Sequence, residues 1–399
     1  MRTQVGIVGA GPAGLLLSHL LHLEGIESIV IERHTREYVE SRVRAGVLEQ
    51  GPVDLLNAVG LGARMRREGL PHEGIGIHFG GLIRRVNFRE LTGRAITVYG
   101  QQEVIKDLIH ARLEAGGRIL FEAEAASLAG LDSAAPTIRF QINGQFEEIA
   151  CDFVGGCDGF HGISRAAIPE SILTIYERIY PFGWLGILAE TPPPSSELIY
   201  ANHANGFALA SMRSPTLSRL YLQCAADEDL AQWPDERIWE ELRRRLSAGG
   251  PVEIREGPVL QKGVTPMRSF VAFPMQYGSL FLAGDAAHIV PPTGAKGMNL
   301  AIADVHLLAR ALVRFYKTGA RDQLEAYSQA CSWRVWRAQH FSWWMTSMLH
   351  RFEGEFAAFD HQRQLAELEY VTGSPFAARA LAENYSGFPL ERQSSSAAQ

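Results

Sequence analysis

The sequence is poor in cysteine and has no excess of positive charge. Only four cysteines occur in 399 residues, and the closest two, Cys151 and Cys157, lack the spacing of a CxxC motif. They therefore indicate neither a disulfide framework nor a redox motif. Lysine and arginine number 38 against 44 aspartates and glutamates, which gives a net charge of −6. Without a basic excess to neutralise phosphates, we expect no nucleic-acid partner.

The sequence also lacks a membrane-spanning segment and a metal-binding cluster. The stretch from Thr3 to Leu23 carries no charged residue except histidine, but its four glycines and Pro12 would interrupt a spanning helix. No small-residue cleavage site follows, so the stretch does not resemble a signal peptide. No His, Cys or carboxylate cluster has metal-ligand spacing. We therefore predict a protein of the reduced cytoplasm that uses no metal and binds no membrane.

The glycines of this stretch fit a dinucleotide site. Val5 to Val8 is a short apolar strand pattern, Gly9-Ala-Gly-Pro-Ala-Gly14 follows, and an apolar helical pattern continues to Leu23. Gly9 allows the tight turn, Gly11 lets a pyrophosphate approach the backbone, and Gly14 lets helix and strand pack closely. Glu32 ends the next strand, 18 residues after Gly14, where an acid accepts from ribose hydroxyls. The whole β–turn–α–β unit predicts phosphate binding at the helix N-terminus.

A basic stretch follows Glu32, with Arg33, His34, Arg36, Arg42 and Arg44. Taken alone, it is either a solvated loop or a surface that faces phosphates.

The rest of the chain alternates strand-like and helix-like patterns, and its length suggests two or three domains. Helical patterns cover 104–113, 235–246, 299–317 and 322–350, and strand patterns cover 28–31, 183–188, 217–224 and 280–283.

Two further short motifs follow apolar strand patterns. Cys157-Asp158-Gly159 follows Phe153-Val154, and Gly284-Asp285-Ala-Ala-His288 follows Leu280 to Ala283. With the N-terminal glycines, in this order, they resemble the three fingerprints of the flavoprotein aromatic hydroxylases, the class A FAD monooxygenases. The resemblance extends to about residue 390. Within the family, further segments are similar to the members that act on 4-hydroxybenzoate: 42–50, 158–165, 180–185, 198–202, 291–297 and 341–345.

The resemblance implies an α/β fold of mixed α+β character, in which a Rossmann-like domain binds FAD and a mixed sheet covers the substrate. We expect the FAD-binding domain at 1–71, 101–174 and 268–317, and the substrate-binding sheet domain at 72–100 and 175–267. A helical interface region is expected at 318–392, and a disordered tail at 393–399. The resemblance also implies a cytoplasmic homodimer.

The activity that the resemblance implies is hydroxylation of 4-hydroxybenzoate at position 3, giving 3,4-dihydroxybenzoate. The enzyme would use FAD, O2 and NADPH, with NADH as the alternative reductant, through a flavin hydroperoxide. No second GxGxxG unit is evident for the nicotinamide donor, and the family binds it transiently. Arg33 and Tyr38 favour NADPH because they suit a 2′-phosphate.

The family's functional residues match positions of this sequence in four groups. The carboxylate clamp matches Ser211, Arg213 and Tyr221, and Tyr200 contacts the phenol end of the substrate. The proton relay matches Tyr200 and Tyr385, with His72 as its solvent end, and the carbonyl of Pro292 approaches substrate and flavin. The FAD contacts match Gly9, Gly11, Gly14, Glu32, Arg42, Arg44, Gln101, Asp158, Arg219, Asp285, Lys296, Met298 and Asn299, beside Leu300. The NAD(P)H surface matches Arg33, His34, Tyr38, Arg44, His161 and Arg268.

The chemistry of these residue types agrees with the implied roles. A spacing of two along a strand puts Ser211 and Arg213 on one face, and a guanidinium matches a carboxylate in a bidentate pair. Tyrosine hydroxyls both donate and accept, and histidine titrates near neutral pH. Asp285 follows a strand end, at the crevice where doubly wound sheets bind ligands. Without the resemblance, an exposed strand with ordinary polar residues would be the better interpretation of Ser211, Arg213 and Tyr221.

Other functions remain open from the sequence. The chain could prefer another substituted benzoate, such as 4-aminobenzoate or 3,4-dihydroxybenzoate. It could instead be a non-catalytic FAD-binding regulatory protein. A plain nicotinamide dehydrogenase is disfavoured by the Asp158-Gly159 and Gly284-Asp285 motifs.

Overall fold

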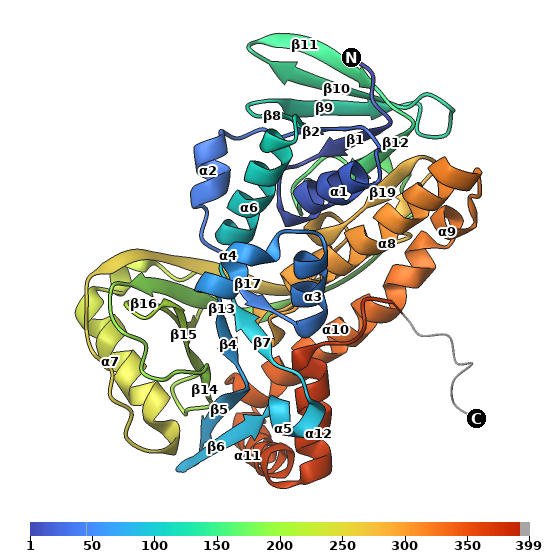
Figure 1. The fold of residues 1–399 in the computed structure, drawn as a ribbon. Helices are drawn as coiled ribbons and strands as arrows, with labels where there is room; N and C mark the ends of the chain where they lie inside the picture. The colour runs from blue at the N-terminus through green and yellow to red at the C-terminus, as the bar shows by residue number, and fades with distance from the viewer. Residues whose placement is uncertain (45, 392–399) are drawn as a thin grey trace, which may run out of the picture.

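The computed structural model describes residues 1–44 and 46–391, and it has the predicted mixed α/β fold (Figure 1). A parallel sheet with helices lies at one end of the molecule, a large mixed sheet lies beside it, and C-terminal helices run along both. The tail predicted at 393–399 lies outside the described residues.

The first sheet is a six-stranded Rossmann-like sheet in the order β18-β19-β12-β1-β2-β8. All neighbours pair in parallel except β18 and β19. The predicted strands at Val5–Val8 and Ser28–Ile31 are confirmed as β1 and β2. The others are β8 (Arg118–Leu120), β12 (Phe153–Gly156), β18 (Gln276–Tyr277) and β19 (Leu280–Leu282).

Helices cover one face of this sheet and a three-stranded meander covers the other. A Cβ added at Gly155 of β12 would lie 2.9 Å from Leu17 of α1, whereas one at Gly6 of β1 would lie 2.5 Å from Ile138 of β10. Glycine therefore allows both layers to approach the central strands. The helices are α1 (Pro12–Leu23), α6 (Gln101–Glu114) and α8 (Gly297–Thr318), and the meander is β9 (Glu124–Ala129), β10 (Thr137–Ile142) and β11 (Gln145–Ala150).

The second large sheet has eight strands in the order β20-β17-β13-β16-β15-β14-β5-β6. Its longest members, β13 (Thr174–Ala189) and β17 (Val259–Phe273), pair in antiparallel fashion along most of their length. Strand β17 therefore includes residues 268–273, which the sequence-based division assigned to the FAD-binding part; that division itself stays a prediction. The remaining strands are β5 (Gly74–Phe79), β6 (Leu82–Asn87), β14 (Ile199–Ala201), β15 (Ala208–Ser214), β16 (Leu217–Cys224) and β20 (His288–Ile289).

The two faces of this sheet have separate cores. The predicted helix α7 (Asp235–Leu246) is confirmed, and its Trp239 and Leu242 pack with Ile199 and Leu222. On the other face, Tyr200 and Trp184 pack with residues of the C-terminal helices. These helices are α10 (Tyr327–Leu349), α11 (Ala357–Gly373) and α12 (Pro375–Ser386). Since alternate strand residues face opposite sides, neighbouring Ile199 and Tyr200 belong to different cores.

Short elements connect the sheets. Strands β3 (Val47–Leu48), β7 (Ile96–Val98) and β4 (Leu70–His72) form a small antiparallel sheet. The helix predicted over 322–350 is divided at Ala326 into α9 (Asp322–Glu325) and α10. The other helices are α2 (Arg36–Ser41), α3 (Gln50–Ala58), α4 (Gly62–Glu68) and α5 (Phe88–Thr92).

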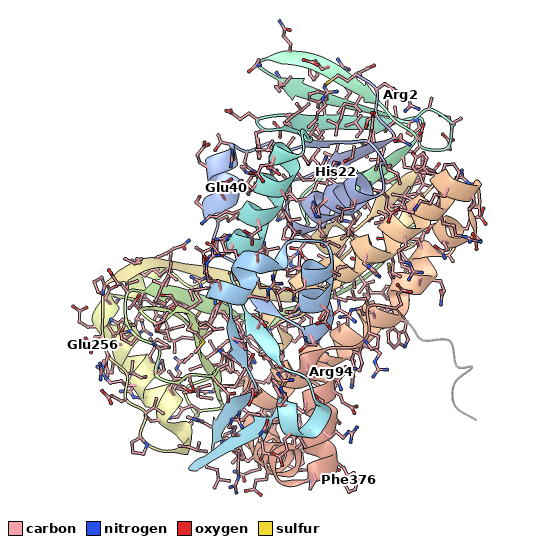
Figure 2. All side chains as sticks on the ribbon, viewed as in Figure 1. Arg2, His22, Glu40, Arg94, Glu256 and Phe376 are labelled. Carbon is pink, nitrogen blue, oxygen red and sulfur yellow. The ribbon has the colours of Figure 1, made fainter. Side chains whose placement is uncertain are left out.

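Two surface properties complete the fold. Among the described residues, no helix combines the length and the apolar composition that a membrane crossing requires. Phe376 is 85% exposed at the start of α12, at the opposite end of the molecule from Arg2 (Figure 2).

Candidate functional site

The predicted FAD residues follow the carboxyl ends of four neighbouring parallel strands. Gly9 follows β1, Glu32 follows β2, Asp158 follows β12, and Asp285 follows β19. The chain runs from β1 to β2 on one side and returns to β12 on the other, so the sheet order reverses at β1. A crevice at such a reversal is where doubly wound sheets bind ligands.

The glycine turn fits a bound pyrophosphate. Gly9 has a φ of 101°, and a Cβ there would lie 2.4 Å from the carbonyl oxygen of Cys157. A Cβ on Gly14 would lie 2.0 Å from the carbonyl oxygen of Gly9, so the turn requires glycine at both positions. A Cβ on Gly11 would meet nothing within 4 Å. This open backbone, at the start of α1, is where the N–H groups and positive end of a helix bind phosphate.

The three acids of the crevice have different partners. Glu32 accepts hydrogen bonds from the backbone N–H of Ala10 at 2.9 Å and of His34 at 2.9 Å. One carboxyl oxygen of Asp158 accepts from the backbone N–H and the hydroxyl of Ser164, both at 2.9 Å, and the other has no partner within the described residues. Burial raises the pKa of Asp158. An unpartnered buried oxygen is costly, and a polar ligand such as a ribityl hydroxyl would satisfy it.

Asp285 lies at the bottom of the crevice. Its side chain is exposed, yet burial raises its carboxyl pKa. Both observations fit a group that lines a recess, where protein surrounds it but solvent reaches it. Asp304 stabilises the turn that carries Asp285. Its carboxylate accepts from the backbone N–H of Gly284 at 3.0 Å and pairs with His288 at 2.6 Å.

Arginines give this recess a positive potential. Burial and the nearby charge of Arg42 lower the pKa of Arg44, whereas Asp285 opposes the shift. The charge of Arg219 also lowers the pKa of Arg44. The side chains of Arg42, Arg44, Arg219 and Asp285 are therefore close enough to interact electrostatically. An excess of guanidinium groups there suits the phosphates of FAD and an anionic substrate.

The N-terminus of α8 also points into this region. The first N–H groups of a helix have no partner within it, and here they belong to Gly297, Met298 and Asn299. The Asn299 side chain is not free to contact a ligand. It accepts from the Glu49 N–H at 2.9 Å and donates to the carbonyls of Val47 and Ala295 at 3.0 and 2.8 Å. A flavin contact at Asn299 would therefore use its backbone. Gln101, also predicted, is the first residue of α6.

The predicted carboxylate clamp lies on the β15–β16 hairpin. Ser211 pairs with Arg219 across the hairpin, and Tyr221 pairs with Leu209. Simple alternation does not continue to Arg213, because a β-bulge falls between Met212 and Ser214. A bulge redirects a side chain, and the Arg213 guanidinium turns towards the first domain, where it donates to the Arg44 carbonyl at 3.0 Å.

The clamp has unused hydrogen-bonding capacity. Arg213 Nε and Arg219 Nη1 are buried nitrogens that have no partner in the part of the chain that the structure describes. Burial raises the pKa of Tyr221, but the nearby charges of Arg219 and Arg213 outweigh it, and the pKa lies below its usual value. Among residues 1–44 and 46–391, neither Arg213 nor Arg219 forms an ion pair with a carboxylate, and two such cations beside a phenol suit an anionic ligand.

Tyr200 and Tyr385 meet in the core beside the clamp. Tyr200 lies on β14 and Tyr385 on α12, and their hydroxyls form a short hydrogen bond although 185 residues separate them. Both side chains are buried, and burial raises both pKa values. The pair is therefore neutral near pH 7 and can pass a proton along its hydrogen bond.

Among the described residues, His72 and Pro292 form no hydrogen bond with this pair. His72, the last residue of β4, is 1% exposed, and neither ring nitrogen has a partner among the described residues. Burial lowers its pKa to about 4. The structure thus buries the residue that was expected at the solvent end of the relay. The Pro292 carbonyl accepts from the Ala295 N–H at 2.9 Å, within a tight turn before α8.

The predicted NAD(P)H residues form two groups. His34 stacks on Tyr38 with ring centroids 4.2 Å apart, and Arg42 lies over the same Tyr38 ring. Arg33 and Arg44 belong to the same stretch of chain. His161 follows Phe160, and Arg268 lies 4.6 Å from the centroid of that Phe160 ring. Within residues 1–44 and 46–391, no hydrogen bond or ion pair joins the two groups.

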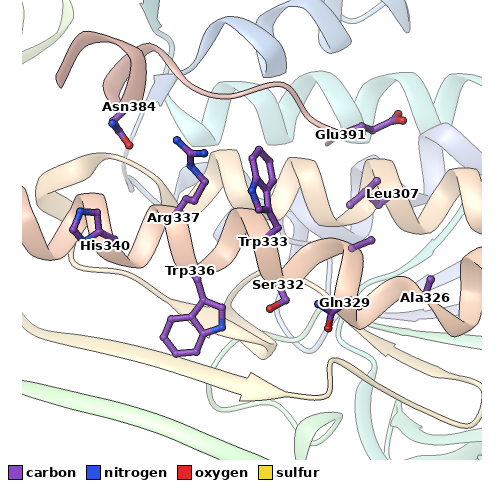
Figure 3. A pocket seen from close by; sticks show the side chains of 11 residues that line it. Leu307, Ala326, Gln329, Ser332, Trp333, Trp336, Arg337, His340, Asn384 and Glu391 are labelled. Carbon is purple, nitrogen blue, oxygen red and sulfur yellow. The ribbon is translucent and has the colours of Figure 1, made fainter. Parts of the chain in front are cut away.

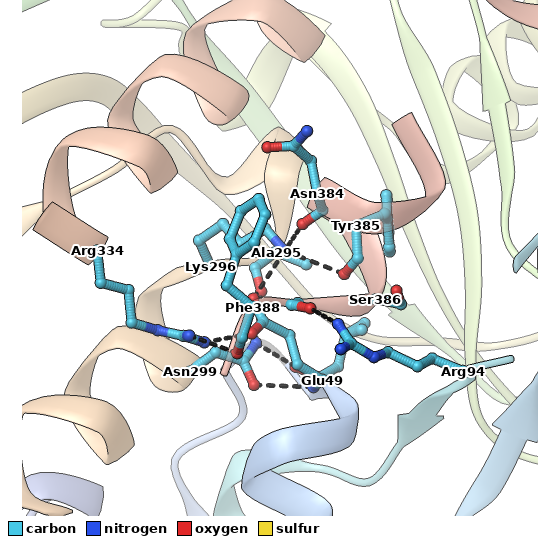
Figure 4. Close-up of polar contacts among 12 residues, drawn as sticks. Glu49, Arg94, Ala295, Lys296, Asn299, Arg334, Asn384, Tyr385, Ser386 and Phe388 are labelled. Atoms are coloured by element: carbon cyan, nitrogen blue, oxygen red, sulfur yellow. Dashed lines mark hydrogen bonds and ion pairs between the residues drawn. The ribbon is translucent and has the colours of Figure 1, made fainter. Parts of the chain in front are cut away.

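A buried charge cluster joins residues 291–296, the loop before α8 that we call the flavin-side loop, to the C-terminal helices (Figure 4). Lys296 pairs with Glu49 at 2.7 Å and donates to the carbonyls of Asn384 and Tyr385 at 2.5 and 3.0 Å. Arg334 pairs with the other oxygen of Glu49. All three Lys296 donors are therefore used within the protein. Sequence reasoning placed Lys296 near the flavin but missed Glu49 and Arg334, which no local motif links to it.

A separate open groove lies along the outer side of α10 (Figure 3). It has a volume of about 1030 Å³, and Trp333, Trp336, Arg337 and Asn384 are among its lining residues. None of the predicted site residues lines it.

Comparison with known proteins shows the family to which the chain belongs. Residues 2–342 match the family described as the FAD binding domain. The chain is 49% identical over 395 residues to the p-hydroxybenzoate hydroxylase of Acinetobacter baylyi (strain ATCC 33305 / BD413 / ADP1), which covers 99% of this chain and 97% of that protein. It is 26% identical to a 3-(3-hydroxy-phenyl)propionate/3-hydroxycinnamic acid hydroxylase of Mycobacterium sp. (strain JLS), over 81% of this chain and 56% of that protein.

Solved structures show the same fold. The p-nitrophenol 4-monooxygenase PnpA from Pseudomonas putida DLL-E4 superposes with a TM-score of 0.84 at 18% identity, over 98% of this chain and 100% of that chain. At this identity the likeness concerns the fold alone.

Proposed function

Because the chain belongs to the family of the FAD binding domain, and within it to the homologues of p-hydroxybenzoate hydroxylase, we propose that it hydroxylates 4-hydroxybenzoate at position 3. The product is 3,4-dihydroxybenzoate, and the co-substrates are O2 and NADPH. The observation that carries the proposal is the hydrogen-bonded Tyr200–Tyr385 pair in the core against which Tyr221 of the clamp packs.

The clamp binds the carboxylate of the substrate. Arg213 donates from its guanidinium, and the hydroxyls of Ser211 and Tyr221 add further hydrogen bonds. Charge-assisted bonds of this kind are about twice as strong as neutral ones. They orient the ring so that its phenol end points towards Tyr200.

When FAD is bound, it supplies the two-electron chemistry that accepts hydride from NADPH and activates O2. The chain's own groups would hold it: the Gly9–Gly14 turn would bind its phosphates, Asp158 and Asp285 would accept from its hydroxyls, and the N-terminus of α8 would lie near the ring. The positive end of that helix would favour negative charge on the ring.

The tyrosine pair raises the electron density of the substrate ring. The Tyr200 hydroxyl accepts the phenolic proton while its own proton moves to the Tyr385 oxygen, and Tyr385 gives up its own hydroxyl proton, which passes on towards His72 and solvent. A more phenolate-like ring is a better nucleophile at the carbon beside the phenol oxygen. His72, neutral at pH 7 because burial lowers its pKa to about 4, accepts the relayed proton only transiently.

A panel of benzoates tests this proposal against its alternatives. Protein loaded with FAD is mixed with NADPH and air, and oxygen-coupled product formation is compared for 4-hydroxybenzoate, 4-aminobenzoate and 3,4-dihydroxybenzoate. The proposal expects 4-hydroxybenzoate to give the highest kcat/KM. A higher value for another benzoate would reassign the substrate, and no substrate-stimulated NADPH oxidation would favour a regulatory FAD-binding protein.

We further propose NADPH rather than NADH, and a site of action in the cytoplasm. Arg33, Arg42 and the His34–Tyr38 stack offer cations and a flat ring face near the crevice, which suits an adenine with a 2′-phosphate. All four cysteines are free and buried, which agrees with a reducing compartment. A kcat/KM for NADH that equals or exceeds that for NADPH would contradict the reductant assignment.

Finally, we propose that two copies associate through α10 and β13. Trp336 is 44% and Trp343 39% exposed on α10, and Tyr176 of β13, 49% exposed, contacts Trp336 with ring centroids 5.2 Å apart. Exposed aromatic groups beside a groove are typical of interfaces. Light scattering should give twice 44.0 kDa for the parent and a monomer for Trp336→Glu, while Phe376→Glu at the far end serves as the control.

A further inference from the structure

His350 lies at the end of α10, behind the proposed substrate pocket. It caps the helix, and its backbone N–H bonds to the Thr346 carbonyl at 3.0 Å. Its ring is fully buried between aromatic rings, with centroid distances of 4.4 Å to Phe207 and 4.8 Å to Phe182. The proposed reaction does not use this imidazole, so its presence in an apolar core needs a reason.

The hydrogen bonds of the ring fix its protonation. Trp184 Nε1 lies 2.7 Å from His350 Nε2. An indole N–H can only donate, so His350 Nε2 must be an unprotonated acceptor. The other nitrogen, Nδ1, lies 3.1 Å from the Thr346 carbonyl and therefore carries the proton. Both ring nitrogens are satisfied only in this neutral tautomer, and burial lowers the His350 pKa to about 3 in agreement.

The backbone around His350 is held as firmly as the ring. Gln364 of α11 donates to the carbonyls of His350 and Ser347, both at 2.7 Å. Asn202, just after β14, donates to the carbonyls of Met348 and Leu349 at 3.2 and 3.3 Å. Side chains from two neighbouring elements thus bind the last carbonyls of α10. These bonds fix the backbone that carries the His350 ring.

From Trp184, packed rings lead directly to the clamp. The Trp184 ring lies 4.9 Å from the Tyr221 ring and stacks at 5.1 Å on Phe207. Phe207 in turn lies 6.1 Å from Tyr200. Both tyrosines assigned to the substrate therefore rest on rings that His350 contacts.

We propose that His350 is a positioning residue for substrate binding: by accepting the Trp184 N–H, it holds the indole in the orientation that places Tyr221 for the carboxylate. This proposal rests on the proposed function, since it concerns the same clamp. It assigns to the histidine a role in affinity for the benzoate, and no contact with substrate or FAD.

The test compares two substitutions at His350. His350→Phe keeps a flat ring for stacking but leaves the buried Trp184 N–H without an acceptor, and His350→Gln retains an acceptor. The dissociation constant for 4-hydroxybenzoate is measured on FAD-loaded protein from the change in flavin absorbance. We expect about a tenfold rise for His350→Phe, the range of an unsatisfied buried donor, and about a threefold rise or less for His350→Gln.

A double-substitution cycle tests whether His350 affects substrate binding through the Trp184 N–H. In a Trp184→Phe background the N–H is absent, so adding His350→Phe should change the dissociation constant by less than about twofold. FAD affinity should be equal in all variants, because His350 contacts none of the FAD residues, whereas general unfolding would weaken FAD binding as well.

Failure of the proposed function and failure of the positioning role of His350 give different results. If the parent protein binds FAD but no benzoate, the proposed function itself fails. If the parent binds 4-hydroxybenzoate and His350→Phe binds it equally well, the positioning role is overturned. A tenfold loss in His350→Gln, or an undiminished His350→Phe effect in the Trp184→Phe background, would overturn it too.

Discussion

At the scale of single residues, the proposed site is defined by polar groups that the protein leaves partly unpaired. Arg213 Nε, Arg219 Nη1 and Asp158 Oδ1 are buried and find no partner among residues 1–44 and 46–391. Most buried polar atoms in folded proteins are hydrogen-bonded. These three atoms belong to residues assigned to substrate or FAD, and a bound ligand would satisfy them; other unpaired buried atoms, such as Trp233 Nε1 and Gln339 Oε1, lie on residues with no assigned role.

Replacing the clamp arginine should weaken substrate binding specifically. Arg213→Ala removes a charge-assisted bond worth roughly 1.5–3 kcal/mol, so the dissociation constant for 4-hydroxybenzoate should rise about 10- to 100-fold. Flavin absorbance titration measures it. Arg243→Ala, which breaks a surface pair with Glu256, is the control and should bind normally. An unchanged dissociation constant for Arg213→Ala would contradict the proposal that the clamp binds the substrate carboxylate.

Breaking the tyrosine pair should affect chemistry more than binding. Tyr200→Phe removes the acceptor for the phenolic proton, and positioned proton transfer contributes about 100-fold or more. We expect NADPH oxidation to continue while hydroxylated product falls and peroxide appears. Product and peroxide are quantified per NADPH consumed. Tyr316→Phe, which removes a hydrogen bond to Asp152, should stay coupled, and full coupling in Tyr200→Phe would exclude the relay.

Local sequence patterns predicted the residues of the FAD crevice better than those of the substrate pocket. Gly9, Gly11, Gly14 and Glu32 belong to one continuous β–turn–α–β unit, whose physics is local. Tyr200 and Tyr385 meet only because β14 and α12 pack together, and no spacing rule relates positions 185 apart. Their assignment from sequence depended entirely on family resemblance.

At the scale of elements, strands and helices were predicted well where the pattern was periodic. Strands β1, β2 and β16 and helix α7 have the predicted bounds. The bulge at Arg213 was not predictable, because period two gives no sign of one extra residue. The break at Ala326 was likewise missed, since alanine there is a good helix former.

The buried Glu49–Lys296–Arg334 cluster should stabilise the contact between α10, α12 and the flavin-side loop. Glu49→Leu leaves Lys296 and Arg334 buried without their shared carboxylate, and such an uncompensated charge typically costs about 3–5 kcal/mol. Urea unfolding followed by circular dichroism measures this loss. Arg314→Ala breaks an exposed pair with Asp322 and should cost less than about 1 kcal/mol. Equal losses in both variants would contradict the structural role of the cluster.

At the scale of the whole molecule, the proposed site combines residues from the two large sheets and from the C-terminal helices. No single sheet or helix forms it. The crevice comes from the first sheet, the clamp from the second, and Tyr385 from α12. Sheet order and strand register, which bring these parts together, depend on long-range packing that a single sequence does not reveal.

The buried histidines should make the fold sensitive to acid. Burial lowers the pKa values of His72 and His350 to about 4 and about 3. Below the unfolded value of about 6.5 the unfolded chain binds more protons, so stability falls as pH decreases from 6.5 towards 4. His350 alone contributes roughly 3 kcal/mol to this loss at pH 4. Urea midpoints across this range should therefore decrease less steeply for His350→Gln, and identical slopes would contradict the assignment.

The most direct test of the account is the fate of the oxygen atom. The FAD-loaded protein is supplied with 4-hydroxybenzoate, NADPH and ¹⁸O₂, and the product is analysed by mass spectrometry. The account predicts 3,4-dihydroxybenzoate that carries a single ¹⁸O, on the carbon beside the original phenol. NADPH oxidation that yields only peroxide, or a hydroxylated product whose new oxygen comes from water, would contradict it.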